Sequence, residues 1–217
     1  VRQARGHGDY GLTIKMATLG LTYLGKLGII EITQPIIDQL ADESKELVRI
    51  AILHSDDLVW VARAQGTHFG LRYDPDYERS VSAHLATSAT GQAWLMTLSD
   101  EEALMRVATQ GFIPQTHAAG QNAPKTAKEL LQIIEDARAR GYTQVVDGYL
   151  DGMSAMAAPF FDPRTNKIAG VVSIAGPSVR LTPAKMASLG PRLMDASQML
   201  TNTISTSRLL TIHPNGN

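Results

Sequence analysis

The sequence predicts an α+β fold in which an antiparallel sheet packs against amphipathic helices. Two pairs of apolar runs, at 48–62 and 153–175, are joined by turn-forming residues and are typical of β-hairpins. Other stretches repeat apolar residues at intervals of three and four, the spacing of one helix face. The 217 residues suit one domain or one and a half, which is long enough to bury a core.

Composition excludes several classes of protein. The chain is 44% hydrophobic and 19% charged, as folded proteins are, and its formal net charge of -1 attracts neither nucleic acid nor an anionic membrane. Without cysteine there are no disulfides, thiolate nucleophiles or thiolate metal sites. No apolar run approaches the roughly 20 residues of a membrane span, and the first ten residues lack the apolar core of a signal peptide. We therefore expect a cytoplasmic protein with no membrane partner.

The first predicted helix begins near Leu12 and ends at Gly28. Its apolar positions follow helical spacing: Leu12, Met16, Leu19, Tyr23 and Leu27. An apolar face this early in the chain needs a partner. The helix either docks on its own domain or serves as a linker or dimerisation helix, and the sequence leaves both interpretations open.

A second helix is expected from about Glu31 to Ser44, with Ile36, Ile37 and Leu40 buried. The first hairpin follows, with strands at 48–53 and 58–62 around a turn at 55–57. Residues 69–73 are predicted as a short third strand, and 74–77 as a turn or loop.

Residues 82–96 combine a run of small side chains at 86–91 with an apolar segment that contains Trp94. This pattern predicts a loop that leads into a helix capped near Thr87 or Ser88. The free amides of a helix N-terminus can hold a carboxylate. Alternatively, the small residues only allow the helix to pack closely on the sheet.

Capping signals mark the next helices. Ser99 and Glu102 form one predicted capping box, and Thr126 and Glu129 form a second, with a loop at 111–125 between the two helices. The helix after the second box is expected to end at Gly141 and to bury Leu130, Ile133, Ile134 and Ala137.

The last predicted helix begins at Thr182-Pro183, with a possible kink at Pro191. Its core-facing positions are Met186, Leu189, Leu193, Ala196 and Leu200. Residues 210–217 have the composition of a frayed tail.

The second hairpin carries a face of small side chains. Because strand residues alternate between faces, Met153 and Ala155 share one face of the first strand, and Ser173 and Ala175 share one face of the second. Small or flexible side chains with one hydroxyl can form the floor of a pocket. The alternative is an ordinary buried hairpin in which the serine has no role.

Common catalytic patterns are absent from the sequence. It contains no phosphate-binding loop, dinucleotide fingerprint or nucleophile elbow. Its six histidines are scattered, without the spacing of a metal site. We therefore expect no metal, no cofactor and no enzyme activity.

The order of elements and several short motifs resemble the effector-binding domain of the isocitrate lyase regulator (IclR) family of bacterial transcription factors. The resemblance covers about 10–208, and residues 8–12 look like the end of the family's winged DNA-binding domain. The motifs that carry it are Ala139-Arg140-Gly141-Tyr142, Gly152, Ala157-Ala158-Pro159, Ser173-Ile174-Ala175-Gly176-Pro177 and Leu181-Thr182-Pro183.

The resemblance implies a GAF-like domain, with a curved antiparallel sheet flanked by helices on both sides and preceded by a linker helix. It divides the chain into the end of a DNA-binding domain with the linker helix (1–28), the effector-binding domain (29–210) and a tail (211–217). It also implies a homodimer or homotetramer that binds promoter DNA through a domain absent from these residues. Ala86 stands where the family often has histidine, with His84 nearby.

By position, the family's ligand-binding residues fall on Ser88, Ala89, Thr90, Asp147, Met153, Ala155, Ser173 and Ala175. We expect a sensor of a small organic acid, whose carboxylate binds the amides of Ala89 and Thr90 and the hydroxyl of Ser173. Two alternatives stay open: a hydrolase or lyase that uses Asp147 as its base, and an oligomerisation module with a filled core.

Overall fold

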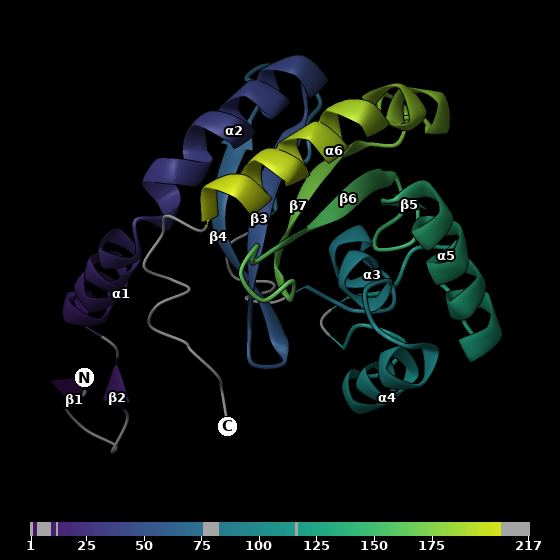
Figure 1. The fold of residues 1–217 in the computed structure, drawn as a ribbon, viewed down its shortest axis with the longest axis horizontal. Coiled ribbons are helices and arrows are strands. Elements are labelled where there is room, and N and C mark those ends of the chain that lie inside the picture. Colours follow the sequence, from purple (N-terminus) through teal and green to yellow (C-terminus); the bar gives the residue numbers. More distant parts are fainter. Residues whose placement is uncertain (1, 4–9, 12, 76–82, 116, 205–217) are drawn as a thin grey trace.

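A five-stranded antiparallel sheet with the order β4-β3-β7-β6-β5 forms the centre of the protein (Figure 1). The computed structural model describes residues 2–3, 10–11, 13–75, 83–115 and 117–204. The strands of the sheet are β3 (Leu47–His54), β4 (Asp57–Gln65), β5 (Thr143–Val146), β6 (Met153–Phe161) and β7 (Ile168–Pro177). A separate pair, β1 (Arg2–Gln3) and β2 (Tyr10–Gly11), is antiparallel.

Both predicted hairpins are confirmed. The β3–β4 hairpin turns at Ser55, which adopts a left-handed backbone with φ of 55°, and the β6–β7 hairpin turns at Asn166, also with φ of 55°. The two hairpins meet through the β3–β7 pair, in which Arg49 is opposite Ser173. This pairing joins segments that are far apart in the sequence.

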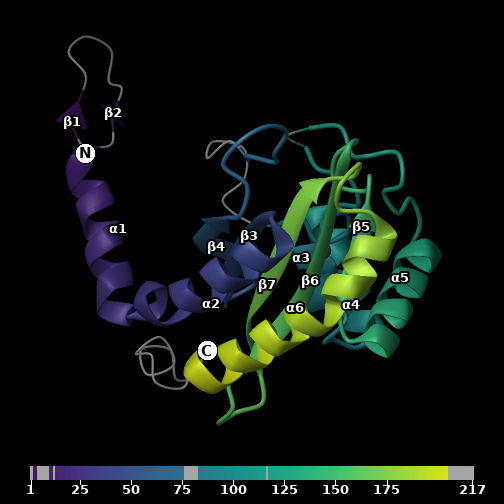
Figure 2. The same cartoon turned by 90° about the horizontal axis from the view of Figure 1, so that it is seen from above.

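Helices cover both faces of the sheet, as the family resemblance implied (Figures 1 and 2). On one face α2 and α6 pack over β3, β4, β6 and β7; on the other face α3 packs on β6 and β7, with α4 and α5 beside it. The helices are α1 (Ile14–Leu27), α2 (Ile29–Ser44), α3 (Ala89–Leu95), α4 (Asp100–Gln110), α5 (Ala127–Arg140) and α6 (Pro183–Ile204).

Strand alternation divides the core into two layers. The α2/α6 layer holds the larger apolar side chains of the sheet, such as Ile50, Phe160 and Ile174. The α3 layer holds smaller ones, such as Ala155 and Ala175. All five predicted core positions of the last helix are buried, and α6 continues through Pro191.

Helix α1 leads away from the sheet and places β1 and β2 far from the core (Figures 1 and 2). It ends where predicted, because Gly28 adopts φ of 64° and starts α2 in a new direction. Ile14, Met16 and Leu19 are 81%, 52% and 66% exposed, so these three residues do not dock on the domain. Leu12 lies outside the described residues.

Helix capping follows the sequence with one correction. Ser88 caps α3, and Ser99 and Glu102 form the complete predicted capping box of α4. Thr126 caps α5 through the Glu129 amide, but the second reciprocal box is not formed. The Glu129 carboxylate accepts instead from the Lys125 amide at 2.7 Å.

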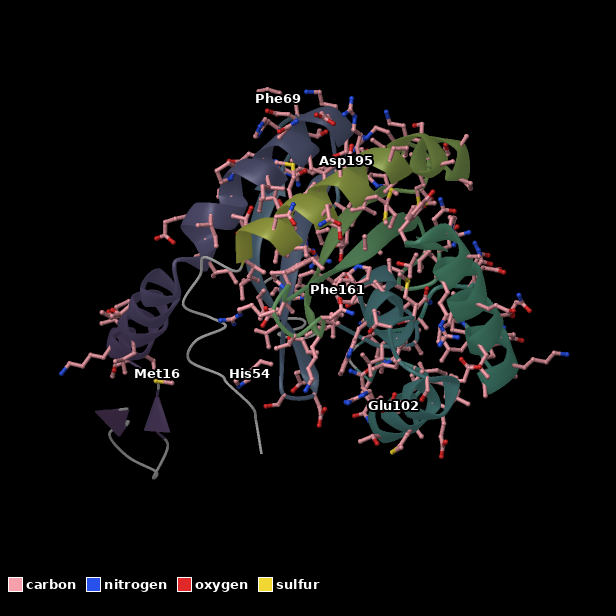
Figure 3. All side chains as sticks on the ribbon, viewed as in Figure 1. Met16, His54, Phe69, Glu102, Phe161 and Asp195 are labelled. Carbon is pink, nitrogen blue, oxygen red and sulfur yellow. The ribbon has the colours of Figure 1, made fainter. Side chains whose placement is uncertain are left out.

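Two further predictions were wrong in detail. Residues 69–73 form no strand; Phe69 is 91% exposed and lies at the periphery (Figure 3). The sheet ends at β4, and the Leu71 carbonyl accepts from Arg180 Nη1 at 2.8 Å instead of joining a ladder. Ile133 is only partly buried.

The predicted tail at 210–217 lies outside the described residues. Among the helices that the structure does describe, none is long and apolar enough to span a membrane.

Candidate functional site

A cavity lies between the start of α3 and the sheet, in the place that strand alternation predicts. Seven of the eight predicted ligand-binding residues line it: Ser88, Ala89, Thr90, Met153, Ala155, Ser173 and Ala175. The other lining residues are Arg49, Trp60, Ala83, His84 and Tyr149. The space left inside is about 20 Å³, which is room for about one water molecule.

Strand register explains why the floor of this cavity is low. Ala155 of β6 is opposite Ala175 of β7, and Ala157 is opposite Ser173. Directly opposed side chains on one face lie about 5 Å apart, so methyl and hydroxymethyl groups form a shallow surface here. Longer apolar side chains at these positions would bring the sheet into contact with α3 and remove the cavity.

The start of α3 is held against this floor by hydrogen bonds. Thr143 Oγ1 on β5 donates to the Ala89 carbonyl at 2.8 Å, and the Ser88 hydroxyl accepts from the Gly91 amide at 3.0 Å. The amides of Ala89 and Thr90 belong to the first turn and precede the helical hydrogen-bond ladder. The alternative role of the small residues, close packing, also applies here. A Cβ at Gly91 would lie 2.3 Å from the His84 carbonyl oxygen, so only glycine fits at this position.

Arg49 brings a positive charge to the cavity. Its guanidinium carbon lies 3.8 Å from the centroid of the Trp60 ring, and its Nε is buried without a hydrogen-bond partner. Burial lowers the pKa of Arg49, against smaller opposing effects of Tyr73 and Tyr149. The Ser173 hydroxyl is likewise buried without a hydrogen-bond partner.

His84 closes one side of the cavity as a neutral imidazole. Its Nδ1 accepts from the Thr87 amide at 3.3 Å and lies 2.9 Å from Thr87 Oγ1. Burial, followed by the nearby charge of His117, lowers the pKa of His84 from 6.5 to about 4, although the Ile113 carbonyl acts in the opposite direction. Near neutral pH, Arg49 is therefore the cation of this lining.

Asp147, the eighth predicted residue, does not line the cavity. It lies directly after β5 with φ of 50°, and its carboxylate accepts from the Gly152 amide at 2.8 Å and from Gln121 Nε2 at 3.4 Å. These contacts stabilise the turn between β5 and β6. The Asp147 side chain therefore has a local structural role, and the geometry gives no support for a base that acts in the cavity.

Sequence reasoning missed Arg49, Trp60 and Tyr149 as lining residues. A signal for Arg49 was present, since alternation places it on the same face as Ala51 and every other residue of 47–53 is apolar. Its position beside Ser173 depends on the β3–β7 pairing, which no local pattern reveals. Within the described part of the chain, no three His, Asp or Glu side chains gather as a metal site would require.

The fold and the cavity define a small α+β domain of the GAF-like class, with polar groups gathered on one face of its sheet. The chain belongs to the family described as bacterial transcriptional regulator IclR C-terminal, whose family model matches residues 21–202.

Curated relatives are transcriptional regulators. The chain is 27% identical over 203 residues to the transcriptional repressor IclR of Escherichia coli, an alignment of 93% of this chain and 71% of that protein. It is 25% identical over 207 residues to the repressor AllR of E. coli, covering 95% and 72% of the two chains.

Solved structures share the fold. A regulator assigned to the IclR family from Silicibacter sp. TM1040 superimposes with a TM-score of 0.77 at 19% identity, over 94% of this chain and 77% of that one. The IclR of Thermotoga maritima superimposes with a TM-score of 0.75 at 18% identity, over 91% of this chain and 77% of that one. At these identities the likeness supports the architecture alone.

Proposed function

We propose that this chain is the ligand-sensing and oligomerising part of an IclR-type transcriptional regulator, and that it binds a small organic acid in the cavity under α3. The effector would alter promoter binding by a winged helix-turn-helix domain outside these residues, in the cytoplasm. The division into 1–28, 29–210 and 211–217, and assembly as a dimer or tetramer, belong to the same proposal.

The observation that carries this proposal is the convergence of seven predicted residues from α3, β6 and β7 on one cavity. A filled core would satisfy its polar groups internally, since an unpaired buried hydroxyl is unfavourable. Here the Ser173 hydroxyl has no partner. A ligand carboxylate that accepts from it, and from the first-turn amides of Ala89 and Thr90, would supply the missing acceptor.

Ligand entry requires side chains to move, because the present space holds about one water molecule. Met153 is unbranched and adapts readily to a neighbour. Trp60 lies on β4, an edge strand with a neighbour on one side only. A rearrangement of these two side chains would enlarge the cavity without breaking the sheet.

Ser173→Ala tests the proposal when stability and affinity are measured together. Affinity for the carboxylate that most raises the melting temperature of the wild-type protein should fall about tenfold or more, because a hydrogen bond to a charged group is worth about 1.5–3 kcal/mol. The melting temperature without ligand should hardly change, since the hydroxyl has no protein partner. A lower melting temperature with unchanged affinity would show that Ser173 belongs to an ordinary core.

A further inference from the structure

Arg49 is a positively charged residue that has no anionic partner in the part of the chain that the structure describes. An arginine stays protonated in proteins, so burial cannot remove its charge as it can for lysine or histidine. Among the described residues, no Asp or Glu carboxylate forms an ion pair with Arg49; Asp74, for example, pairs with Arg63 and Arg72. Arg49 is partly buried and its Nε is fully so, and a desolvated cation without a counter-charge destabilises a fold, so such a residue needs another reason to be there.

The contact with Trp60 compensates only part of this penalty. The indole ring lies under the guanidinium carbon at 3.8 Å and offers attraction to the charge. A ring face does not satisfy the in-plane N–H groups, and Nε remains buried without an acceptor. The Trp60 ring therefore covers the face of the guanidinium, while the Nε–H donor at its edge stays unsatisfied.

Strand register places Arg49 beside a second residue that carries an unsatisfied polar group. Arg49 on β3 is directly opposite Ser173 on β7, so their Cβ atoms lie about 5 Å apart on the same face. Both side chains line the same cavity. A guanidinium and a hydroxyl that line one cavity can donate to the two oxygens of one carboxylate bound between them.

We propose that Arg49 is the counter-charge of the effector's carboxylate and makes the cavity select acids over neutral molecules of the same shape, with Ser173 donating to the same carboxylate. This inference rests on the proposed function and adds to it a residue that decides ligand class. It predicts an effector with at least one carboxylate that is desolvated when bound.

The test compares carboxylic acids with their own amides in the wild-type protein and in Arg49→Met. The probes are acetate, pyruvate, benzoate and phenylacetate as sodium salts, each with its primary amide, against sodium chloride at equal ionic strength. In the wild-type protein at least one acid should raise the melting temperature while its amide does not. Arg49→Met should weaken binding of that acid about 10- to 100-fold and bring acid and amide to similar affinities.

Arg63→Met is the matched control, because Arg63 is opposite Arg49 on β4 but does not line the cavity. It should keep the preference for acid over amide. Arg49→Lys keeps the positive charge but loses the planar guanidinium group, so it should retain only part of the preference for acid over amide. If Arg49→Met does not fold, this partial loss in Arg49→Lys is measured instead.

The outcomes separate the two proposals. Equal acid affinity in wild type and Arg49→Met, or an amide that binds wild type as well as its acid, would overturn the role of Arg49 while leaving a ligand-binding cavity in place. If none of the four acids raises the melting temperature of the wild-type protein, the acid-sensing function itself fails, and the role of Arg49 fails with it.

Discussion

Gly91 is the position at which a single methyl group should damage the cavity most. A Cβ there would meet only backbone atoms: the His84 carbonyl oxygen at 2.3 Å, Leu85 Cα at 2.4 Å and the Leu85 carbonyl oxygen at 2.7 Å. Contacts below 3.0 Å force a shift, and backbone atoms cannot rotate away as a side chain can. The loop 84–85 and the start of α3 must therefore separate in Gly91→Ala.

The magnitude follows from two opposing effects. Overpacking costs about 1–3 kcal/mol, or more where backbone must move, while alanine gains up to about 1 kcal/mol in helix propensity. We expect a net loss of about 1–2 kcal/mol for Gly91→Ala, which for a chain of this length lowers the melting temperature by roughly 2–8 °C. Differential scanning calorimetry without ligand measures this directly.

Gly20→Ala is the matched control, since Gly20 lies within α1 and a Cβ there would have nothing within 4 Å. Only the propensity gain applies, so the melting temperature should stay equal or rise slightly. If Gly91→Ala melts at the same temperature as Gly20→Ala, then the close approach of α3 to residues 84–85 is wrong, and the cavity geometry with it.

Three further predictions concern stability. Arg180→Met should cost about 2–4 kcal/mol in chemical denaturation, because it leaves the Glu46 carboxylate, with a side chain only 3% exposed, without its partner. Ser99→Ala should cost about 1 kcal/mol in the same assay, through loss of the cap that accepts from the Glu102 amide. Because the pKa of His84 is lowered from 6.5 to about 4, the unfolded chain binds a proton that the native state rejects between these values. Stability should therefore fall by roughly 1–3 kcal/mol as pH drops from 6.5 to 4, and His84→Gln, but not exposed His68→Gln, should flatten this slope in urea titrations.

Local patterns predicted the parts of the cavity that depend on period and capping. The two-residue period of a strand fixes which residues share a face, so Met153 with Ala155, and Ser173 with Ala175, could be grouped by their spacing in the sequence. The Ser88 cap could be predicted because a serine hydroxyl accepts a hydrogen bond from a backbone amide in the first turn of the helix that follows it. In both cases the residues that carry the pattern lie within a few positions of the structural feature they predict.

The remaining features depend on contacts between distant segments. Arg49 and Trp60 lie on the hairpin β3–β4, which the sequence predicted, but this hairpin meets the small-residue floor only because β3 pairs with β7, which no local spacing specifies. Asp147 was grouped with the cavity by family position, but its carboxylate is occupied by the Gly152 amide. Residues 69–73 have strand-like alternation, yet they pair with no edge because the sheet ends at β4.

The most direct test of the cavity as the ligand site is Ala89→Leu. Ala89 is 2% exposed and lines the cavity, so a leucine side chain would occupy the space that a ligand needs. Ala196→Leu is the control, because Ala196 is a similarly buried alanine in the α2/α6 layer, and both variants should lose about 1–3 kcal/mol from overpacking.

The measurement is the rise in melting temperature that the strongest-binding carboxylate produces in wild type, Ala89→Leu and Ala196→Leu, with circular dichroism to confirm folding. We expect the rise to disappear in Ala89→Leu and to persist in Ala196→Leu. An undiminished rise in folded Ala89→Leu would show that the ligand binds elsewhere and that the cavity under α3 is not the ligand site.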